Sequence, residues 1–327
     1  MLSVHPSIYS SSIFLSLFTS LVVGQACQLQ FDGRVPDDLA ATDLNVPNDI
    51  FSESFVIGQG LTFSQALLLL PASTGSLVRS NRPLEFNFLF TNRSPMQFDL
   101  NANAPIAVSI SDQSIFNNQV AFRRAELIPA SNDGTDTSTQ GVKTLHFSVL
   151  KDNTRPLNLS HEYQLAFLES QDFSTNQFVL KTGTILGQDT ADPDTLQLFG
   201  NVNQGEVLFS TPFTAGVFHN FALTLDFEQL FVPASSAPDL VLFVNPRHST
   251  TQVFFSTGDD ALAAVTDVLQ NDVSGQGQFH FGVLKKPVGG VGDITKNGFQ
   301  PDAIDEAVVF GGIFQEDSAD GCISLSP

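Results

Sequence analysis

The chain has 327 residues, which is enough for one large β-domain or two small domains. Its 14 lysines and arginines and 34 aspartates and glutamates give a formal net charge of −20. Such a charge repels nucleic acid, anionic membranes and polyuronates, and it leaves neutral polysaccharide as the compatible polymer.

Residues 1–26 predict a cleaved secretory signal. They contain no Asp, Glu, Lys or Arg, and the apolar run from Ile13 to Val23 is followed by the small residues Gly24 and Ala26. This run is shorter than the ~18 uninterrupted apolar residues that a membrane span needs. The alternative interpretation is a buried N-terminal helix. We expect a secreted, extracellular protein whose mature chain begins at Cys27.

Secretion bears on the cysteines and on two asparagines. Cys27 and Cys322 are the only cysteines, and we expect them to pair in an oxidising compartment. This bond requires the two ends of the mature chain to meet in space; two unpaired thiols are the alternative. Asn92 and Asn158 each begin an N-x-Ser sequon and are predicted glycosylation sites, the first disfavoured by Pro95.

From about residue 84 onward, apolar and polar residues alternate with the two-residue period of β-strands. Turn-rich segments rich in Gly, Asn and Asp separate the alternating runs. The predicted strands are LEFNFLF (84–90), TLHFSVL (144–150), HEYQLAFLE (161–169), QFVLKTG (177–183), HNFALTLDF (219–227), TQVFFSTG (251–258) and QFHFGVLK (278–285). Many short strands of this kind predict an all-β, two-sheet antiparallel sandwich of jelly-roll type.

Helical signal is scarce in this sequence. The segments 62–70 and 260–269 are the two candidates for short helices. No Gly-Ser or Pro-Thr linker divides the chain and no repeat is visible. We therefore expect residues 27–327 to form a single catalytic domain, and we expect a monomer.

Several catalytic motifs are absent from the sequence. It has no CxxC, no HExxH, no Gly-rich phosphate loop and no GxSxG, and its six histidines show no metal-ligand spacing. Pairing of both cysteines excludes thiol catalysis, whereas a serine triad is unsupported but not excluded. We expect neither a metal nor an organic cofactor.

Charged residues embedded in apolar strands are the candidates for chemistry. In FRRAEL (122–127), Arg124 and Glu126 project to one face of an extended strand, and a carboxylate beside a guanidinium stays ionised. Glu169 ends an apolar run, where desolvation favours a general acid. In QFHFGV, His280 and Gln278 face away from the core. The ordinary alternatives are a surface ion pair, a solvated glutamate and a surface imidazole.

Two carboxyl groups on one sheet are what glycoside hydrolysis requires, since one protonates the leaving oxygen while the other activates water or attacks the sugar. By contrast, the position of His219 within its strand points toward the core, which indicates a buried structural role. The spacing of these residues along the chain does not show whether they converge.

At these residues the chain resembles glycoside hydrolase family 131, a family of secreted fungal enzymes. The resemblance runs from Cys27-Gln28-Leu29-Gln30-Phe31-Asp32-Gly33-Arg34 to Gly321-Cys322. Long and uncommon strings carry it, namely FRRAEL (122–127), LNLSHEYQLAFLES (157–170), STNQFVLKTGTILG (174–187), DPDTLQLFGN (192–201), SGQGQFHFGVLKKP (274–287) and GGIFQEDS (311–318).

The resemblance implies a β-jelly-roll with an open cleft on one concave sheet, and hydrolysis of β-1,3-, β-1,6- and β-1,4-glucans with inversion. It points to Glu126 and Glu169 as the catalytic pair, with Glu169 chosen over Glu162, which falls on the opposite face of a regular strand. It implies that four further residues bind or orient the β-glucan substrate. These are Arg124, His280, Gln278 and Lys285.

Two departures from the family pattern keep rival functions open. The segment 228–248 is about twenty residues longer than we expect, and the chain has no Trp, with only two Tyr to stack on sugar rings. A non-catalytic glucan-binding lectin of the same fold is therefore the alternative. A polysaccharide lyase, suggested by the Arg-x-Glu-Leu string of alginate-lyase folds, ranks third because the acidic surface disfavours a uronate substrate.

Overall fold

The computed structural model describes residues 27–52, 56–70, 103–228 and 249–326. The predicted signal (1–26), the predicted strand 84–90, the Asn92 sequon and the long segment 228–248, except for its first residue, lie outside the described residues. Within the described part of the chain, no helix has the length and apolarity that crossing a membrane requires.

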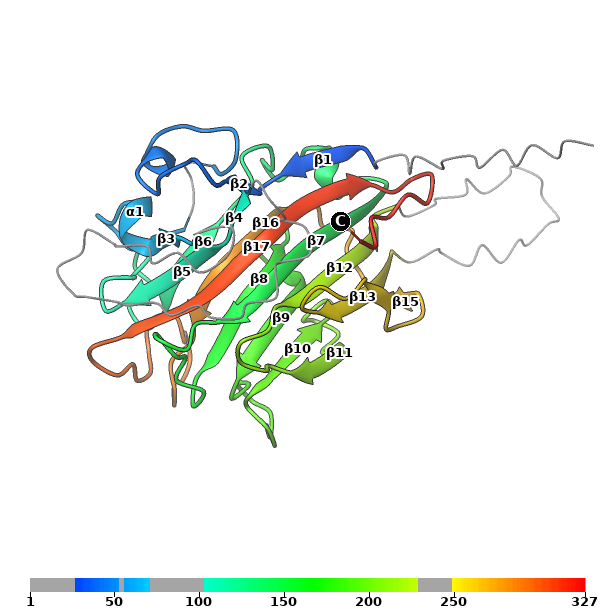
Figure 1. Cartoon of the computed structure of the whole chain (residues 1–327). Coiled ribbons are helices and arrows are strands. Elements are labelled where there is room, and N and C mark those ends of the chain that lie inside the picture. Colours follow the sequence, from blue (N-terminus) through cyan, green and yellow to red (C-terminus); the bar gives the residue numbers. More distant parts are fainter. Residues whose placement is uncertain (1–26, 53–55, 71–102, 229–248, 327) are drawn as a thin grey trace, which may run out of the picture.

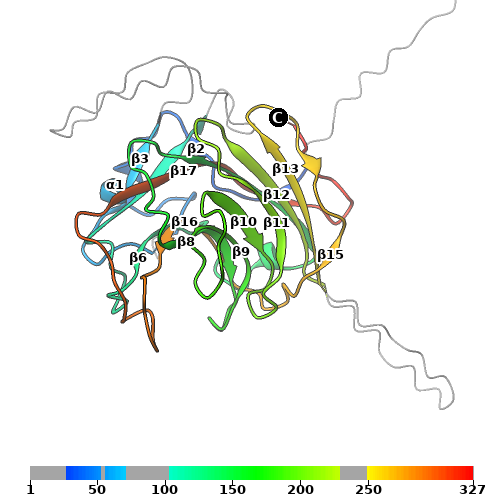
Figure 2. The same ribbon diagram turned by 90° about the horizontal axis from the view of Figure 1, so that it is seen from below.

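Two antiparallel sheets stack face to face to form the sandwich, and the strands of the larger sheet arch over those of the smaller one (Figure 2). The larger sheet has the order β14-β13-β12-β7-β17-β5-β3, with β1 paired to β17 and β15 paired to β13. Its strands are β1 (Leu29–Asp32), β3 (Leu67–Leu69), β5 (Ile106–Ser111), β7 (Val142–Lys151), β12 (His219–Asp226), β13 (Thr250–Thr257), β14 (Ala263–Ala264), β15 (Leu269–Gln270) and β17 (Asp305–Asp317).

The smaller sheet has the order β11-β10-β9-β8-β16-β6. Its strands are β6 (Arg123–Leu127), β8 (Glu162–Glu169), β9 (Asn176–Gly183), β10 (Thr195–Phe199), β11 (Val207–Pro212) and β16 (Gln278–Lys285). Strands β2 (Val35–Pro36) and β4 (Asn103–Ala104) form a separate short pair (Figure 1). The predicted strands among the described residues are present, with ends within two residues of those expected, and the architecture confirms the jelly-roll prediction.

The core lies between the two sheets and is rich in phenylalanine. Phe147 and Phe221 of the larger sheet stack with their ring centroids 5.3 Å apart, and Phe147 also meets Phe281 of the smaller sheet at 5.8 Å. Phe178 and Phe279 of the smaller sheet contact each other in the same core. Because most inward positions of the alternating strands are apolar, the opposite positions are free to carry polar side chains.

The two expected helices behave differently from each other. Residues 62–70 begin as expected, with α1 (Phe63–Ala66) closed by a capping box between Thr62 and Gln65, but the chain then extends into β3. The helix expected over 260–269 is wrong. Its residues instead form β14 and β15, which pair with the exposed edge of β13. Two short 3-10 turns, at Asp43–Asn45 and Thr137–Thr139, complete the helical structure of the described residues.

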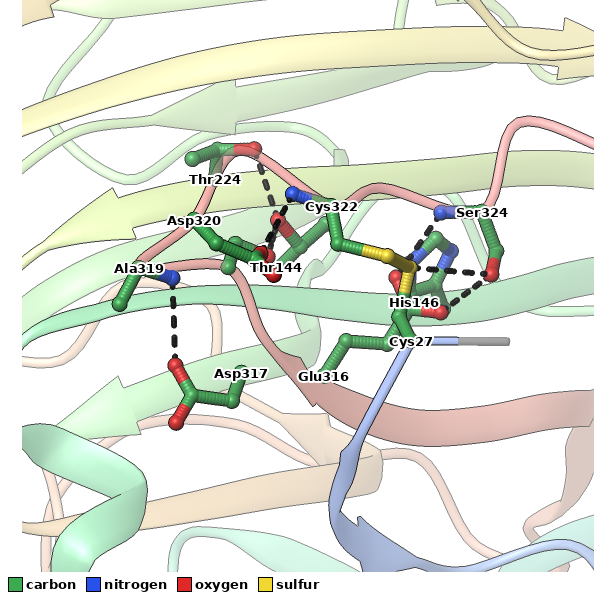
Figure 3. The surroundings of a disulfide bond; sticks show 11 residues. Cys27, Thr144, His146, Thr224, Glu316, Asp317, Ala319, Asp320, Cys322 and Ser324 are labelled. Atoms are coloured by element: carbon green, nitrogen blue, oxygen red, sulfur yellow. Dashed lines mark hydrogen bonds and ion pairs between the residues drawn. A yellow bond between two sulfur atoms is a disulfide. The ribbon is translucent and has the colours of Figure 1, made fainter. Parts of the chain in front are cut away.

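A disulfide joins Cys27 to Cys322, as predicted, across 295 residues of sequence and with a Cα separation of 5.6 Å (Figure 3). The buried Glu316 of β17 fastens the same end of the chain. Its carboxylate accepts a hydrogen bond from the Ser324 backbone N–H at 3.0 Å and contacts Nε2 of the buried His146 at 3.0 Å. The two ends of the described chain are thus held against the larger sheet.

Candidate active site

Strands β6 and β16 lie side by side and turn several polar residues to the outer face of the smaller sheet. Ala125 and Leu127 of β6 belong to the core, which places Arg124 and Glu126 on the opposite face, as expected. Gly282 of β16 pairs with Glu126. A Cβ atom at this glycine would lie 2.0 Å from a β6 carbonyl oxygen, so only glycine permits this close approach of the strands.

Glu126 is a fully buried carboxylate with three charged or polar contacts. Arg124 donates two hydrogen bonds to it, from Nε to Oε1 at 2.7 Å and from Nη2 to Oε2 at 2.8 Å. Nδ1 of His280 contacts the same Oε2 atom at 2.9 Å. The guanidinium is itself fixed by a bond from Nη1 to the Gln119 side-chain oxygen at 3.0 Å. The fork geometry is the strong bidentate form of this ion pair.

The charge state of Glu126 follows from these contacts. Burial alone would raise the pKa of this carboxyl, but the Arg124 charge and the hydrogen bonds from His280 and Arg124 outweigh burial and lower the pKa to about 2. Glu126 is therefore ionised at any pH at which a secreted enzyme works. An ionised acceptor requires that Nδ1 of His280 carry the proton of their contact.

His280 connects the two glutamates. Its ring lies flat against Phe167, with centroids 4.5 Å apart and planes within 8° of parallel, so packing and the Glu126 bond fix its orientation. Nε2 is buried, has no hydrogen-bond partner among the described residues, and lies 3.7 Å from Oε2 of Glu169. In the neutral imidazole with its proton on Nδ1, Nε2 is a proton acceptor, and it lies on the side of Glu169.

Glu169 lies at the end of β8, and its side chain is 27% exposed, compared with 0% for Glu126 and 3% for His280. It is the glutamate of the pair with a surface that a substrate can touch. His280 contacts Glu126 through Nδ1 at 2.9 Å and approaches Glu169 through Nε2 at 3.7 Å. Together with the width of the imidazole ring, these distances limit the separation of the two carboxyl groups to about 9 Å. The structure thus brings together the two glutamates, the arginine and the histidine expected from the sequence.

A β-bulge in β8 decides which glutamates share this face. Leu165 and Ala166 both pack into the core, and the register of β8 against β9 shifts at this point. The extra residue reverses the alternation, so Glu162 and Glu169 lie on the same face, contrary to the expectation for a regular strand. Glu162 nevertheless has a different role. Its buried carboxylate contacts Lys286 Nζ at 2.7 Å and Lys181 Nζ at 3.3 Å.

Gln278 and Lys285, the two other residues expected to bind substrate, lie on opposite sides of the smaller sheet. The Gln278 side chain lies on the outer face and donates to the backbone oxygen of Asn132 at 2.9 Å. Lys285 is fully buried, and its Nζ donates to Glu306 at 2.6 Å while lying 5.8 Å from the Tyr163 ring centroid. Lys285 is therefore an interior ion pair and is not brought to the cluster around Glu126, contrary to the expectation. The strand alternation QFHFGVLK already carried this signal, because Lys285 shares the parity of Phe279.

Sequence reasoning missed three residues that hold the cluster in place. They are Gln119, which fixes Arg124, Phe167, which packs on His280, and Phe116, whose ring centroid lies 5.7 Å from the Arg124 guanidinium. Phe167 lies in the apolar run Leu165-Ala166-Phe167-Leu168, which does not distinguish it from the core residues beside it. The other two come from the loop before β6, which has no periodicity to reveal them.

Two surface hollows flank the cluster. One includes Phe116, beside Arg124, and has a volume of about 470 Å³. The other is lined in part by Ser170, the residue after Glu169, and has a volume of about 450 Å³. His219 lies elsewhere, buried in β12, as expected. In the described parts of the chain, no three His, Cys, Asp or Glu side chains are grouped to hold a metal ion.

Comparison with known proteins identifies the family of the chain. The family model of the glycoside hydrolase 131 catalytic N-terminal domain matches residues 29–321. A GH131 β-glucanase catalytic domain from Podospora anserina superposes with a TM-score of 0.62 at 22% identity, over 91% of this chain and 98% of that one. The catalytic domain of a family 131 protein from Coprinopsis cinerea gives 0.60 at 21%, over 92% and 98%.

No curated protein sequence matches the chain. The family model nevertheless covers most of the described structure, including each strand of the smaller sheet and the four residues of the cluster. Both solved structures are matched over almost their whole length. The chain belongs to glycoside hydrolase family 131.

Proposed function

We propose that this glycoside hydrolase is secreted and cleaves β-1,3-, β-1,6- and β-1,4-linked glucans with inversion, using Glu126 and Glu169 as its carboxylate pair. The observation that carries the proposal is the row Glu126–His280–Glu169, with a fixed negative charge at one end and a partly exposed carboxyl at the other. The Podospora anserina structure is that of a β-glucanase, and the charge of −20 suits a neutral polymer.

The two glutamates have different tasks in this proposal. Glu169, the exposed member, donates a proton to the glycosidic oxygen as the bond from this oxygen to the anomeric carbon breaks. A water forms the new bond to that carbon and gives its proton to Nε2 of His280. Buried Glu126 touches no substrate, and it stabilises the positive charge that the imidazole acquires. Glu126 is thus a positioning residue that acts through His280.

The separation of the carboxyl groups is compatible with an inverting reaction. Inverting enzymes hold their two carboxyls roughly 6.5–9.5 Å apart, whereas retaining enzymes hold them about 5–5.5 Å apart. The limit of about 9 Å set by His280 is compatible with the wider range. A sugar between Nε2 and Glu169 requires the Glu169 side chain to turn outward, and its place at the end of β8 allows this movement.

Substitution of each glutamate tests the proposal. We expect E169Q to lower kcat on laminarin and on hydroxyethyl cellulose by about 10²–10⁴-fold, because the amide cannot donate the proton. E126Q should also lower kcat, since the imidazolium that forms on His280 during the reaction loses its counter-charge.

The matched control is E162Q, which changes a glutamate on the same strand and the same face but outside the cluster. It should keep activity within a few-fold of the wild type, with circular dichroism confirming that each variant is folded. Undiminished turnover by folded E169Q and E126Q, or a loss confined to E162Q, contradicts the proposed pair.

A glucan-binding lectin is the second candidate, and the specific observation in its favour is the absence of Trp from the chain. Chromatography after long incubation separates the two functions, because a lectin retains the polymer and releases no sugar. The same chromatograms, read at about 235 nm, detect the unsaturated product of a lyase through its absorbance. Release of saturated oligosaccharides supports the hydrolase.

A further inference from the structure

An exposed phenylalanine stands on the loop that joins β8 to β9. Phe173 is 74% exposed, the most of any phenylalanine in the described residues, and its backbone φ is +59°. Large side chains avoid this left-handed region because the Cβ atom crowds the carbonyl oxygen. Phe173 therefore combines an unfavourable backbone conformation with an apolar ring exposed to water. Backbone strain of this kind is often found at functional sites.

The loop that carries Phe173 is closed on itself by hydrogen bonds. The Phe173 N–H donates to the Ser170 carbonyl at 2.8 Å, and the Ser170 N–H donates to the Thr175 carbonyl at 2.9 Å. Oδ1 of Asp172 accepts from the hydroxyls of Ser170 and Ser174, both at 2.7 Å. A ring held outward on such a loop loses little conformational freedom when it binds a ligand.

The hollow beside this loop has the polar groups that sugar hydroxyls need. Asp172 and Asp272 line it, and each uses Oδ1 to accept bonds from a nearby serine. The Oδ2 atom of each carboxylate has no hydrogen-bond partner within the described chain. Asn203 offers an exposed side-chain amide in the same hollow. Carboxylates accept from hydroxyls, and amides both donate and accept.

We propose that Phe173 and this hollow form a subsite for glucose units of the polymer beyond the unit at Glu169. The ring of Phe173 provides an apolar platform for a pyranose face, and the free oxygens of Asp172 and Asp272 accept from its hydroxyls. Ser170, the residue after Glu169, is one of the residues that line the hollow. Asp172 and Ser174, on either side of Phe173, line it as well. The inference rests on the proposed glucan-cleaving function and adds a residue that selects long substrates.

Chain-length dependence tests the subsite. We expect F173A to lower the ratio of kcat/KM for cellohexaose to that for cellotriose by about fivefold, through a higher KM for the longer substrate. The matched control is F299A, which removes a phenylalanine that is 64% exposed on the loop between β16 and β17. It should leave the ratio unchanged. An unchanged ratio in F173A, with active wild-type enzyme, overturns the subsite and leaves the proposed hydrolysis intact.

A binding measurement separates failure of the subsite from failure of the hydrolysis. Because the chain has no Trp, F173W introduces its sole indole fluorophore, and E169Q in the same chain prevents turnover. We expect laminarin and cellohexaose to shift or quench this emission by at least 10% in a saturable manner, whereas F299W with E169Q should not respond. A silent F173W signal at saturating glucan contradicts the subsite. Saturable binding together with an inactive wild type would support the subsite and contradict the proposed hydrolysis.

Discussion

Glu126 carries a buried negative charge on the outer face of the smaller sheet. An isolated carboxylate would strongly destabilise the fold at this position. The bidentate Arg124 contact and the His280 contact compensate it, and together they lower its pKa to about 2. A carboxylate with all of its neighbours fixed serves better as a permanent charge than as a group that gains and loses protons during turnover. This is why we place the moving protons on His280 and Glu169.

The lowered pKa of Glu126 makes stability depend on pH. The unfolded value is about 4.5, so the ionised form stabilises the native state above pH 4.5, and this contribution is lost as the pH falls toward about 2. In urea titrations between these pH values, we expect the free energy of unfolding of E126Q to fall with acidification less steeply than that of the wild type. The slopes should differ by up to about 1.4 kcal/mol per pH unit, which corresponds to one proton.

Equal slopes for E126Q and the wild type would mean that Glu126 titrates normally in the folded protein. Other carboxyls with lowered pKa values, such as Glu162 and Glu316, contribute equally to both proteins and cancel in this comparison. The variant itself should be less stable at neutral pH by about 3–5 kcal/mol, because Arg124 then lacks its counter-charge in a buried position.

At the residue scale, sequence reasoning succeeded where strict alternation sets direction. The apolar residues of FRRAEL and QFHFGV pointed inward, so Arg124, Glu126 and His280 had to share the outer face. It failed for Lys285, which shares the parity of Phe279 and therefore lies in the interior. It also missed Gln119, because side chains on an aperiodic loop have no direction that a pattern can fix.

At the scale of single elements, β8 shows where periodicity misleads. The sequence reads as a regular strand, yet one extra residue near Leu165 reverses the alternation and brings Glu169 to the same face as Glu162. The bulge is an outcome of pairing with two neighbours of different register, which no single strand encodes. The stretch 260–269 failed for a related reason, since pairing with the edge of β13 decided its conformation.

The loop between β8 and β9 offers a test at this scale. We expect F173G to raise the free energy of unfolding by about 1 kcal/mol, because glycine adopts the φ of +59° without steric cost. The same substitution should weaken glucan binding, since it removes the ring. Chemical denaturation with wild type and F299G in parallel checks the stability change. A destabilised F173G would show that Phe173 supports the loop instead of being strained by it.

At the scale of the whole molecule, the disulfide and the Glu316 contacts hold the two ends of the described chain on the larger sheet (Figure 3). The cluster around Glu126 lies on the smaller sheet. We expect replacement of both cysteines by serine to lower the free energy of unfolding by about 2–5 kcal/mol, mainly by freeing the unfolded chain. Below the unfolding temperature, kcat should remain within a few-fold of wild type. A selective loss of kcat in a folded variant would instead link the chain ends to the active site.

The overall architecture was accessible from the sequence because many alternating strands and two terminal cysteines leave few ways to bury the apolar faces. The convergence of the site residues was not accessible from the sequence. Glu126, Glu169 and His280 come from β6, β8 and β16, and only the strand order of the sheet makes these strands neighbours. The predicted sequon at Asn158 stays a prediction. It lies in an exposed turn in which Oδ1 accepts from the Ser160 hydroxyl at 2.8 Å.

The most direct test of the central claim is a double-mutant cycle between Glu169 and His280, measured as kcat/KM on laminarin. If the two groups act as one proton-transfer unit, the combined variant E169Q/H280N should be no more than about threefold slower than the slower of its two single variants. If the losses of the single variants instead multiply in the double variant, the two side chains act independently. That result would contradict the assignment of this row of residues as the catalytic centre.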